Sequence, residues 1–121
     1  MRIAFGERLP DATLEVYADG ERALDALSTG SLADCDLVLL DLKLPGVGGH
    51  EVLAAVRSAA DERVRRVPVV VLSHSEVVDD VTRSYDLGAN SHIAKPHSLD
   101  ALFEVVETLG RYWLNVVSLP N

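Results

Sequence analysis

Residues 37–41 have the sequence Leu-Val-Leu-Leu-Asp, four apolar side chains followed directly by a carboxylate. A second run of the same kind, Val69-Val70-Val71-Leu72-Ser73, follows Pro68. Neither run alternates apolar with polar residues, which is typical of strands that are covered on both faces, as in a parallel sheet. The two stretches therefore predict the buried centre of a parallel β-sheet.

The flanking sequence contains further short strand and helix patterns, separated by Gly, Pro and capping residues. Strands are also expected at residues 13–18, where polar and apolar residues alternate, and at residues 91–94. Helices are expected near residues 19–27, 49–56, 75–85 and 98–109. Strands that alternate with helices predict an α/β fold, a doubly wound parallel sheet with right-handed crossovers.

Length and charge restrict the class of protein. The chain has 121 residues and a formal net charge of −8, which predicts a single domain whose surface repels nucleic acid and anionic lipid. The apolar runs are too short to cross a bilayer, and the first residues lack the apolar core of a signal peptide. A lone cysteine, Cys35, fits a reducing compartment. We therefore expect a cytoplasmic protein with neither nucleic acid nor membrane as a partner.

Three polar side chains follow three of the expected strands: Asp41, Ser73 and Lys95. Taken singly, they would be turn, cap and surface residues. However, the next helix begins too far away for Asp41 to cap it, and Pro96 restricts Lys95 to an extended conformation. Because the carboxyl ends of parallel strands meet at one edge of the sheet, we expect the three residues to form one site.

The chemistry that this trio supports is phosphoryl transfer. An oxygen of Asp41 can attack phosphorus, Lys95 can offset the charge of the phosphoryl group, and the Ser73 hydroxyl can donate a hydrogen bond to it. A carboxylate beside a phosphoryl group also calls for a hard divalent cation with oxygen ligands, most naturally Mg²⁺.

The motifs of this chain lie at residues 39–46 (LLDLKLPG), 67–73 (VPVVVLS) and 87–96 (LGANSHIAKP). Together they resemble the receiver domain of response regulators, over nearly the whole chain. The opening Ala4-Phe5 and the ending Tyr112-Trp113-Leu114 are similar to stand-alone receivers of the bacterial phytochrome type. The resemblance implies a flavodoxin-like topology and no enzymatic activity beyond self-phosphorylation and autodephosphorylation.

The resemblance also implies roles for individual residues. By it, Asp41 is the phosphoacceptor, Ser73 is the hydroxyl that follows the phosphoryl group, and Lys95 is the family's lysine. The backbone carbonyl of Lys43 is a metal ligand beside Asp41. His92 stands where the family usually has an aromatic switch residue.

The N-terminus departs from the family pattern. The family's first strand is central and ends in an acidic pair that binds Mg²⁺, whereas no such pair follows a strand pattern upstream of Asp41. We interpret residues 1–8 as the tail of the family's first helix, so that the chain is truncated at its N-terminus. The competing alignment makes residues 2–5 the first strand, with the single carboxylate of Glu7 after it.

Truncation would leave a gap in the sheet between the strands at Leu14 and Leu37, with unpaired backbone groups on both sides. The fold would rearrange, a partner would fill the gap, or the natural start would lie upstream. Mg²⁺ binding should then be weak.

Three functions remain open. The leading hypothesis is a phosphorelay receiver that takes its phosphoryl group from a sensor histidine kinase and signals to a downstream protein by binding alone. The alternative is a receiver-like interaction module that exchanges no phosphate, because the acidic pair is absent. A hydrolase of the haloacid-dehalogenase type is disfavoured, because Lys43 occupies the position of its general acid.

Two further predictions concern the histidines and the C-terminus. The spacing of His74, His92 and His97 matches no zinc motif, so His92 is interpreted as a packed, titratable ring. The last helix continues into apolar residues that one packed face cannot bury, among them Tyr112, Trp113 and Leu114. The tail could fold back on its own domain. We expect instead a homodimer anchored by these residues, since the resemblance implies symmetric dimers.

Overall fold

The computed structural model describes residues 3–5, 15–16, 20–29, 32, 35–42, 48–73 and 78–118. Its strands are β1 (Ile3–Phe5), β2 (Glu15–Val16), β3 (Leu37–Asp41), β4 (Val69–Ser73) and β5 (Ser91–Ala94). Its helices are α1 (Gly20–Ser28), α2 (Gly49–Arg57), α3 (Glu62–Arg65), α4 (Val78–Asp86) and α5 (Leu99–Arg111), the last followed by a turn of π-helix, Tyr112–Val116. The chain thus alternates strands and helices, as its sequence predicts.

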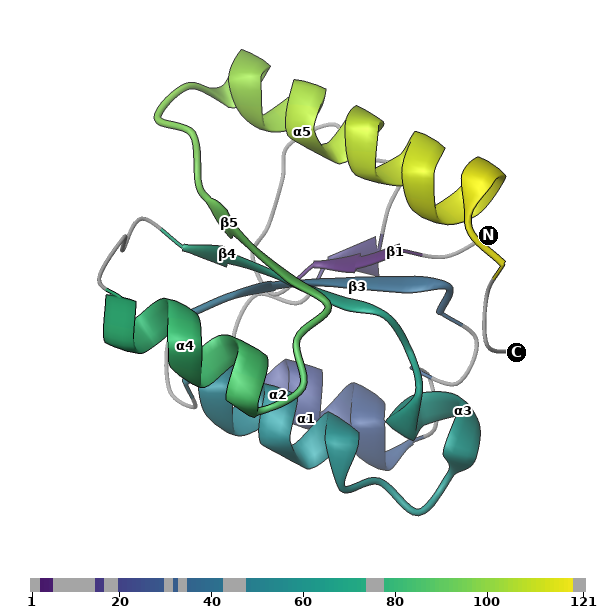
Figure 1. Ribbon diagram of the computed structural model, residues 1–121. Coiled ribbons are helices and arrows are strands. Elements are labelled where there is room, and N and C mark those ends of the chain that lie inside the picture. Colours follow the sequence, from purple (N-terminus) through teal and green to yellow (C-terminus); the bar gives the residue numbers. More distant parts are fainter. Residues whose placement is uncertain are drawn as a thin grey trace.

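The sheet is parallel throughout, with the strand order β2-β1-β3-β4-β5. Figure 1 shows α5 on one face of this sheet and α1, α2 and α4 on the other. Helices on both faces bury the central strands, and every residue of β3 and β4 is buried. The predicted α/β doubly wound sheet is therefore confirmed.

The expected gap in the sheet is not present. β1 lies between β2 and β3, and its residue Ala4 is in register with Glu15 of β2 on one side and with Val38 of β3 on the other. The interpretation of Ile3–Phe5 as the tail of a helix is therefore wrong, and the competing alignment, which made residues 2–5 a strand, describes the sheet. The physical reason for a strand here is hydrogen bonding. A central strand pairs with the backbone N–H and C=O groups of both neighbouring strands, and without it those groups would be unpaired.

Smaller differences follow from element length. Helix α3 was not predicted, because its four residues are too few to show a periodic pattern. The side chain of Asp61 caps this helix by accepting a hydrogen bond from the Arg63 backbone N–H at 2.9 Å. The Ser98 hydroxyl caps α5 as predicted, since it accepts a hydrogen bond from the Ala101 N–H at 3.1 Å. Ser75 and Asp19, the caps expected for two other helices, lie outside the described residues.

The core consists of two clusters of buried apolar side chains, one on each face of the sheet. The larger lies between the sheet and the helices α1 and α2, and includes Cys35, Val38, Leu40, Leu53 and Val69. The smaller lies under α5 and comprises Leu37, Leu39, Val70, Leu72, Leu102 and Leu109. Successive residues of β3 and β4 thus point to opposite clusters, as the two-residue period of a strand requires.

The strands β4 and β5 are joined at their amino ends by the side chain of Arg57. Its guanidinium donates hydrogen bonds to the carbonyls of Val67 at 2.6 Å, Gly88 at 2.9 Å and Arg65 at 3.0 Å. It also donates to the side-chain oxygen of Asn90 at 2.9 Å, which accepts the Val69 N–H at 2.8 Å. Helix α2 is therefore fixed to the sheet at the end opposite Asp41.

Candidate functional site

Three strands end at one edge of the sheet, and each brings one polar residue there. Asp41 is the last residue of β3, Ser73 is the last residue of β4, and Lys95 follows the last residue of β5. Asp41 is in register with Leu72, and Ser73 is in register with Ala94. The structure thus brings together the three residues that the sequence predicts.

Asp41 and Lys95 form an ion pair. The Lys95 Nζ donates a hydrogen bond to the Asp41 Oδ2 at 2.7 Å, and the two side chains are only 10% and 8% exposed. The Lys95 backbone N–H donates to the Ser73 carbonyl at 2.7 Å, which holds the lysine against the end of β4. Burial lowers the pKa of the Lys95 ammonium group. A carboxylate and a cation are therefore placed in a largely water-free site, where charges interact strongly.

Ser73 lies between these two residues in the order of the strands, because β4 separates β3 from β5. Its side chain is almost completely buried. A hydroxyl at this position lies beside both the carboxylate strand and the lysine strand. The predicted grouping of a carboxylate, a hydroxyl and an ammonium group at one edge is confirmed; what each of them does stays a prediction.

A glycine lets helix α2 begin close to the carboxylate strand. The Gly49 N–H donates to the Leu42 carbonyl at 3.3 Å. A Cβ atom on Gly49 would lie 2.4 Å from the backbone oxygen of Asp41, closer than atoms can approach. Sequence analysis placed the helix start at Gly49 without giving this reason. The close approach fixes the backbone of Asp41 against the first turn of α2.

The donor set for a magnesium ion is incomplete in the described part of the chain. Mg²⁺ requires several oxygen ligands, and the described residues at this edge supply the one carboxylate of Asp41, which is paired with Lys95. Among the described residues, no group of three or more His, Cys, Asp or Glu side chains could hold a metal ion. Lys43, the predicted carbonyl ligand, and Glu7 lie outside those residues. The residues in view therefore do not fit a Mg²⁺ site by themselves.

His92, the predicted switch residue, is packed against helix α4. Its Nδ1 lies 2.9 Å from the Ser84 Oγ, and its backbone N–H donates to the Tyr85 hydroxyl at 3.3 Å. The His50 Nε2 lies 2.9 Å from the same Ser84 Oγ. Sequence analysis missed His50 and Ser84, since nothing in their local sequence shows that α2 and α4 bring them together. His74 lies outside the described residues.

The predicted dimer residues have different environments. Tyr112 is 53% exposed, and its ring meets that of Trp113 edge to face, with centroids 5.4 Å apart. Trp113 is partly buried and packs against the smaller core cluster, so at this residue the tail does fold back on its own domain. The side chain of Leu114 lies outside the described residues. Of the three, Tyr112 is the one whose side chain is known to be open to solvent.

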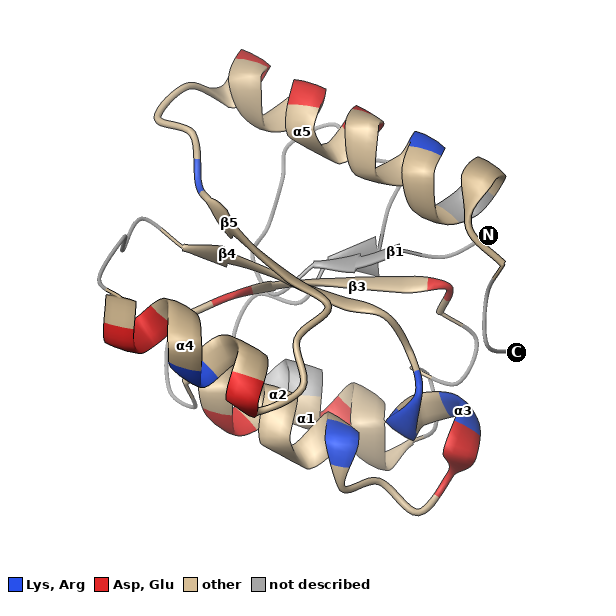
Figure 2. Cartoon of the chain, viewed as in Figure 1, with Lys and Arg blue, Asp and Glu red and all other residues tan. Residues whose placement is uncertain are grey.

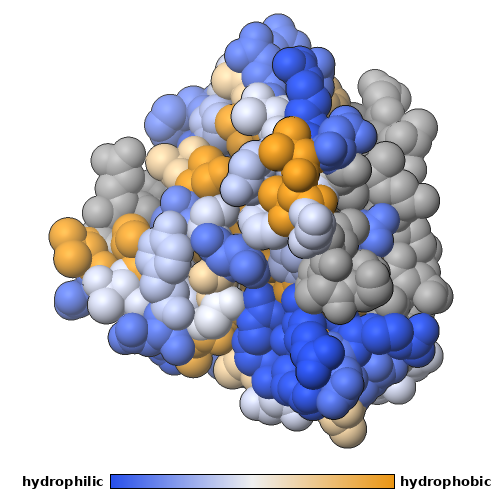
Figure 3. Space-filling view, turned by 45° about the vertical axis from the view of Figure 1, so that its right-hand side comes forward, coloured by the Kyte–Doolittle hydropathy of each residue, from blue (hydrophilic) through white to orange (hydrophobic). Residues whose placement is uncertain are grey.

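The surface also bears on possible partners. Figure 2 shows acidic residues along α5 and at both ends of α4. Figure 3 shows hydrophobic atoms in separate areas of a largely hydrophilic face. In the part of the chain that the structure describes, no helix has the length and apolar character needed to span a membrane.

Comparison with known proteins identifies the family. The family model for the response regulator receiver domain matches residues 3–107. A probable methanogenesis regulatory protein, FilR2 of Methanothrix harundinacea, is 43% identical over 104 residues, covering 84% of this chain and 66% of the relative. Response regulator Rcp1 of Synechocystis is 44% identical over 85 residues, covering 70% of this chain and 56% of the relative. The chain spans about two thirds or less of these curated relatives.

Solved structures agree over nearly the full chain. The phosphorylated cyanobacterial phytochrome response regulator RcpA is 37% identical, with a TM-score of 0.80 over 99% of this chain and 98% of that one. The Mn²⁺-bound form of Rcp1 is 33% identical, with a TM-score of 0.77 over 98% of each chain. The resemblance drawn from the three sequence motifs is therefore confirmed, and the chain belongs to the response regulator receiver domain family.

Proposed function

We propose that this protein is a phosphorelay receiver that accepts a phosphoryl group on Asp41 from a sensor histidine kinase. The observation that carries the proposal is the Lys95–Asp41 ion pair of 2.7 Å at the carboxyl end of the sheet. An ion pair that only stabilises the fold could lie anywhere in the protein. This one lies at the carboxyl ends of the strands, which is where parallel α/β sheets bind their ligands. RcpA, a relative of similar fold, is described as phosphorylated. As such a receiver, the protein would act in the cytoplasm, with protein partners and not nucleic acid.

The proposed reaction uses the residues of the site as follows. An oxygen of the Asp41 carboxylate attacks the phosphorus of a phosphohistidine, the P–N bond breaks, and the imidazole leaves with the electron pair and takes up a proton. The Lys95 ammonium group then pairs with the phosphoryl oxygens instead of with a free carboxylate. The Ser73 hydroxyl donates a hydrogen bond to another phosphoryl oxygen.

A small phosphodonor tests this assignment. Acetyl phosphate with Mg²⁺ should add one phosphoryl group to the intact chain, measured as a mass increase, and Asp41→Asn should abolish it. Asp36→Asn, which changes a carboxylate just before the other end of β3, is the matched control and should leave the mass increase unchanged. Undiminished phosphate on the Asp41→Asn protein would refute the assignment.

A second candidate function rests on the metal ligands. Because the described residues supply one carboxylate at this edge, the protein could instead be a receiver-like interaction module that exchanges no phosphate. We propose that Mg²⁺ binds weakly and that phosphorylation is slow. Titration calorimetry should show weak binding, and Gly6→Asp, which places an acidic pair with Glu7 directly after β1 in the sequence, should strengthen it. Tight binding to the unchanged chain would contradict this proposal, and no phosphorylation even after Gly6→Asp would favour the interaction module.

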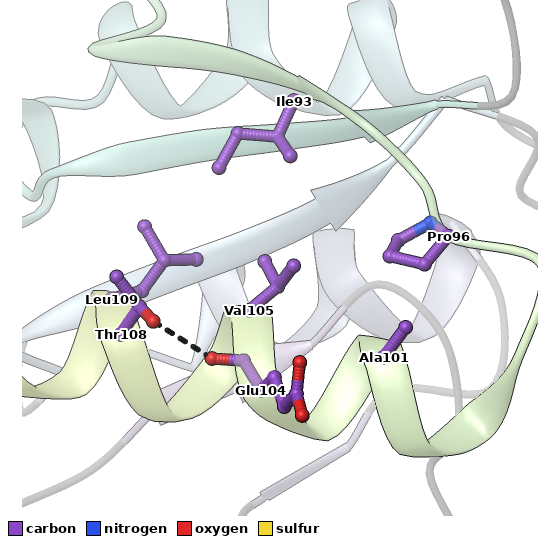
Figure 4. Close-up of a pocket in the computed structure, with 7 residues that line it drawn as sticks. All are labelled: Ile93, Pro96, Ala101, Glu104, Val105, Thr108 and Leu109. Carbon is purple, nitrogen blue, oxygen red and sulfur yellow. Dashed lines mark hydrogen bonds between the residues drawn. The ribbon is translucent and has the colours of Figure 1, made fainter.

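Signalling would occur through the surface formed by β5 and α5. A pocket of about 410 Å³ lies there, lined by Ile93, Pro96, Ala101, Glu104, Val105, Thr108 and Leu109 (Figure 4). Ile93 and Pro96 flank the segment that carries Lys95, so a change in the partner of Lys95 acts directly on the pocket wall. We expect acetyl phosphate to shift the amide NMR signals of Ile93 and Ala101, and Asp41→Asn to prevent the shift. Unchanged signals on a phosphorylated chain would exclude this route.

A homodimer through the end of α5 remains part of the proposal. Tyr112 and Val116 are exposed. Trp113 lies between them in the sequence and packs against the smaller core cluster of its own chain. Sedimentation equilibrium at micromolar concentration should give about twice the chain mass. Tyr112→Ser with Val116→Ser should give a folded monomer, whereas Thr108→Ser, a conservative change on the same helix, should leave the dimer intact. A monomeric parent chain would refute the dimer.

A further inference from the structure

One hydroxyl joins three elements of the fold on the face that carries α2 and α4. The side chain of Ser84 on α4 is fully buried, and its Oγ lies 2.9 Å from both the His50 Nε2 on α2 and the His92 Nδ1 on β5. The same Oγ donates a hydrogen bond to the Asp80 carbonyl at 3.0 Å. The cluster plays no part in the phosphoryl chemistry proposed for Asp41.

Counting protons fixes the state of both imidazoles. A serine hydroxyl has one proton to donate and two lone pairs to accept with. A carbonyl can only accept, so the proton of Ser84 goes to Asp80. Both rings must therefore donate to Ser84: His50 is protonated on Nε2, and His92 is protonated on Nδ1. One proton on each ring, at that atom, is enough to complete the three hydrogen bonds of the Ser84 hydroxyl.

The second ring nitrogen of His92, Nε2, is buried and has no hydrogen-bond partner among the described residues. An N–H group at this position would therefore be buried without an acceptor among the described residues, and a buried donor without an acceptor is destabilising. Opening of the packing between β5 and α4 would relieve that cost by admitting water.

We propose that His50, Ser84 and His92 form a proton-sensitive latch, which holds α2, α4 and β5 together while both rings are neutral and releases α4 from β5 on acidification. The latch goes beyond the proposed phosphorelay function, because it requires no phosphoryl group. It offers the receiver a second input, the proton concentration, at the face of β5 that carries the predicted switch residue.

The surrounding charges set the direction of the response. Burial and the Arg83 guanidinium lower the pKa of His50 and His92 lowers it further, whereas the carboxylate and the backbone carbonyl of Asp80 both raise it. The Tyr85 hydroxyl is the remaining titratable group at the cluster, through its hydrogen bond with the His92 backbone. At His50 the folded state thus binds fewer protons than the unfolded state just below the ordinary histidine value of about 6.5. The free energy of unfolding should accordingly fall as the pH drops through that range.

Nitrogen-detected NMR of the full chain tests the proton count directly. At pH 7.5 we expect the Nε2-protonated tautomer for His50 and the Nδ1-protonated tautomer for His92. The opposite tautomer at either ring would overturn the latch. A failure of phosphorylation at Asp41 would leave this measurement unaffected.

Amide hydrogen exchange tests the release. On lowering the pH from 7.5 to 5.5, protection of α4 and β5 amides should fall about tenfold after correction for the intrinsic exchange rate, equivalent to about 1.4 kcal/mol. His50→Gln with His92→Asn places amide N–H donors near the positions of His50 Nε2 and His92 Nδ1 but cannot titrate, so its protection should persist at pH 5.5. His97→Gln, which removes a histidine outside the cluster, should behave like the parent. Equal losses in the double variant and the parent would overturn the proposal.

The shared acceptor gives an independent test. Ser84→Ala should lower the protection of α4 and β5 at pH 7.5, whereas Thr82→Ala, which removes an exposed hydroxyl from the same helix, should not. Identical protection in the two variants would contradict the role of Ser84. If Ser84→Ala fails to fold, the double variant of His50 and His92 still decides the question.

Discussion

A buried cation lies near each end of the sheet, and the two have different partners. At the carboxyl end, Lys95 pairs, among the described residues, with the carboxylate of Asp41. At the amino end, Arg57 donates to the carbonyls of Arg65, Val67 and Gly88 and to the Asn90 side chain, all of them neutral groups. Burial lowers the pKa of both cations. Among the described residues, the desolvation is thus offset by neutral acceptors at Arg57 and by a charged acceptor at Lys95.

The difference shows at which end of the sheet the partner of the cation can change its charge. The backbone carbonyls around Arg57 cannot change their charge, so that end is a fixed joint between α2, β4 and β5. In the proposed reaction, the carboxylate at Lys95 gains a phosphoryl group and becomes an acyl phosphate, which changes what the ammonium group binds. A glycine allows close packing at each end: Gly88 lies against the Arg57 side chain, and Gly49 lies against the Asp41 backbone.

The largest effect is expected at the fixed joint. Arg57→Ala should lower the free energy of unfolding by about 3 kcal/mol, because it leaves several buried carbonyls without donors. Urea denaturation measures the change. Arg63→Ala removes an exposed arginine from the neighbouring helix α3 and should barely move the midpoint. If the two variants had equal midpoints, the amino end would not be the joint described here.

Lys95→Ala should cost less, about 2 kcal/mol at pH 7, because it leaves the Asp41 carboxylate buried without its cation. In the Asp41→Asn background the same substitution should cost well under half as much, since no charge is left unpaired. The double-mutant cycle, measured by urea denaturation, isolates the ion pair. Additive effects would show that Lys95 acts through packing alone.

Gly49→Ala should lower stability by about 1–2 kcal/mol, because the new methyl group overlaps a backbone oxygen that cannot move aside. It should also slow phosphorylation by acetyl phosphate, since the first turn of α2 must shift away from Asp41. Gly48→Ala is the matched control, because a Cβ atom there meets nothing within 4 Å. Equal phosphorylation rates in the two variants would separate Gly49 from the site.

The smallest effect is expected for Gly88→Ala, about 1 kcal/mol, since φ is +102° there and the nearest atoms belong to the flexible Arg57 side chain. Gly110→Ala, in the last turn of α5 before the π-helical turn and with open space around it, should instead raise the thermal midpoint. Thermal unfolding followed by circular dichroism distinguishes the two. A stabilised Gly88→Ala protein would mean that Arg57 moves freely, and would weaken the comparison between the two ends.

The sequence was most informative about the carboxyl edge. The apolar runs before Asp41 and Ser73 are continuous, so both strands could be predicted, each ending one residue before its observed end; the bounds of β5 were predicted correctly. Strand β1 was misassigned because three residues carry no period, and its place is decided by the strands that it pairs with. The contacts of Ser84 depend on how α2 and α4 pack. No local pattern encodes that arrangement.

The buried position of Cys35 has a practical consequence for measuring motion in this protein. It is the sole cysteine of the chain, and its side chain is 2% exposed within the larger core cluster. A thiol reagent can reach it only when that cluster opens, so the rate of labelling under native conditions reports the rate or the equilibrium of opening, depending on reagent concentration. Labelling of Cys35 therefore measures the opening of the core on the α2 side of the sheet without an introduced probe.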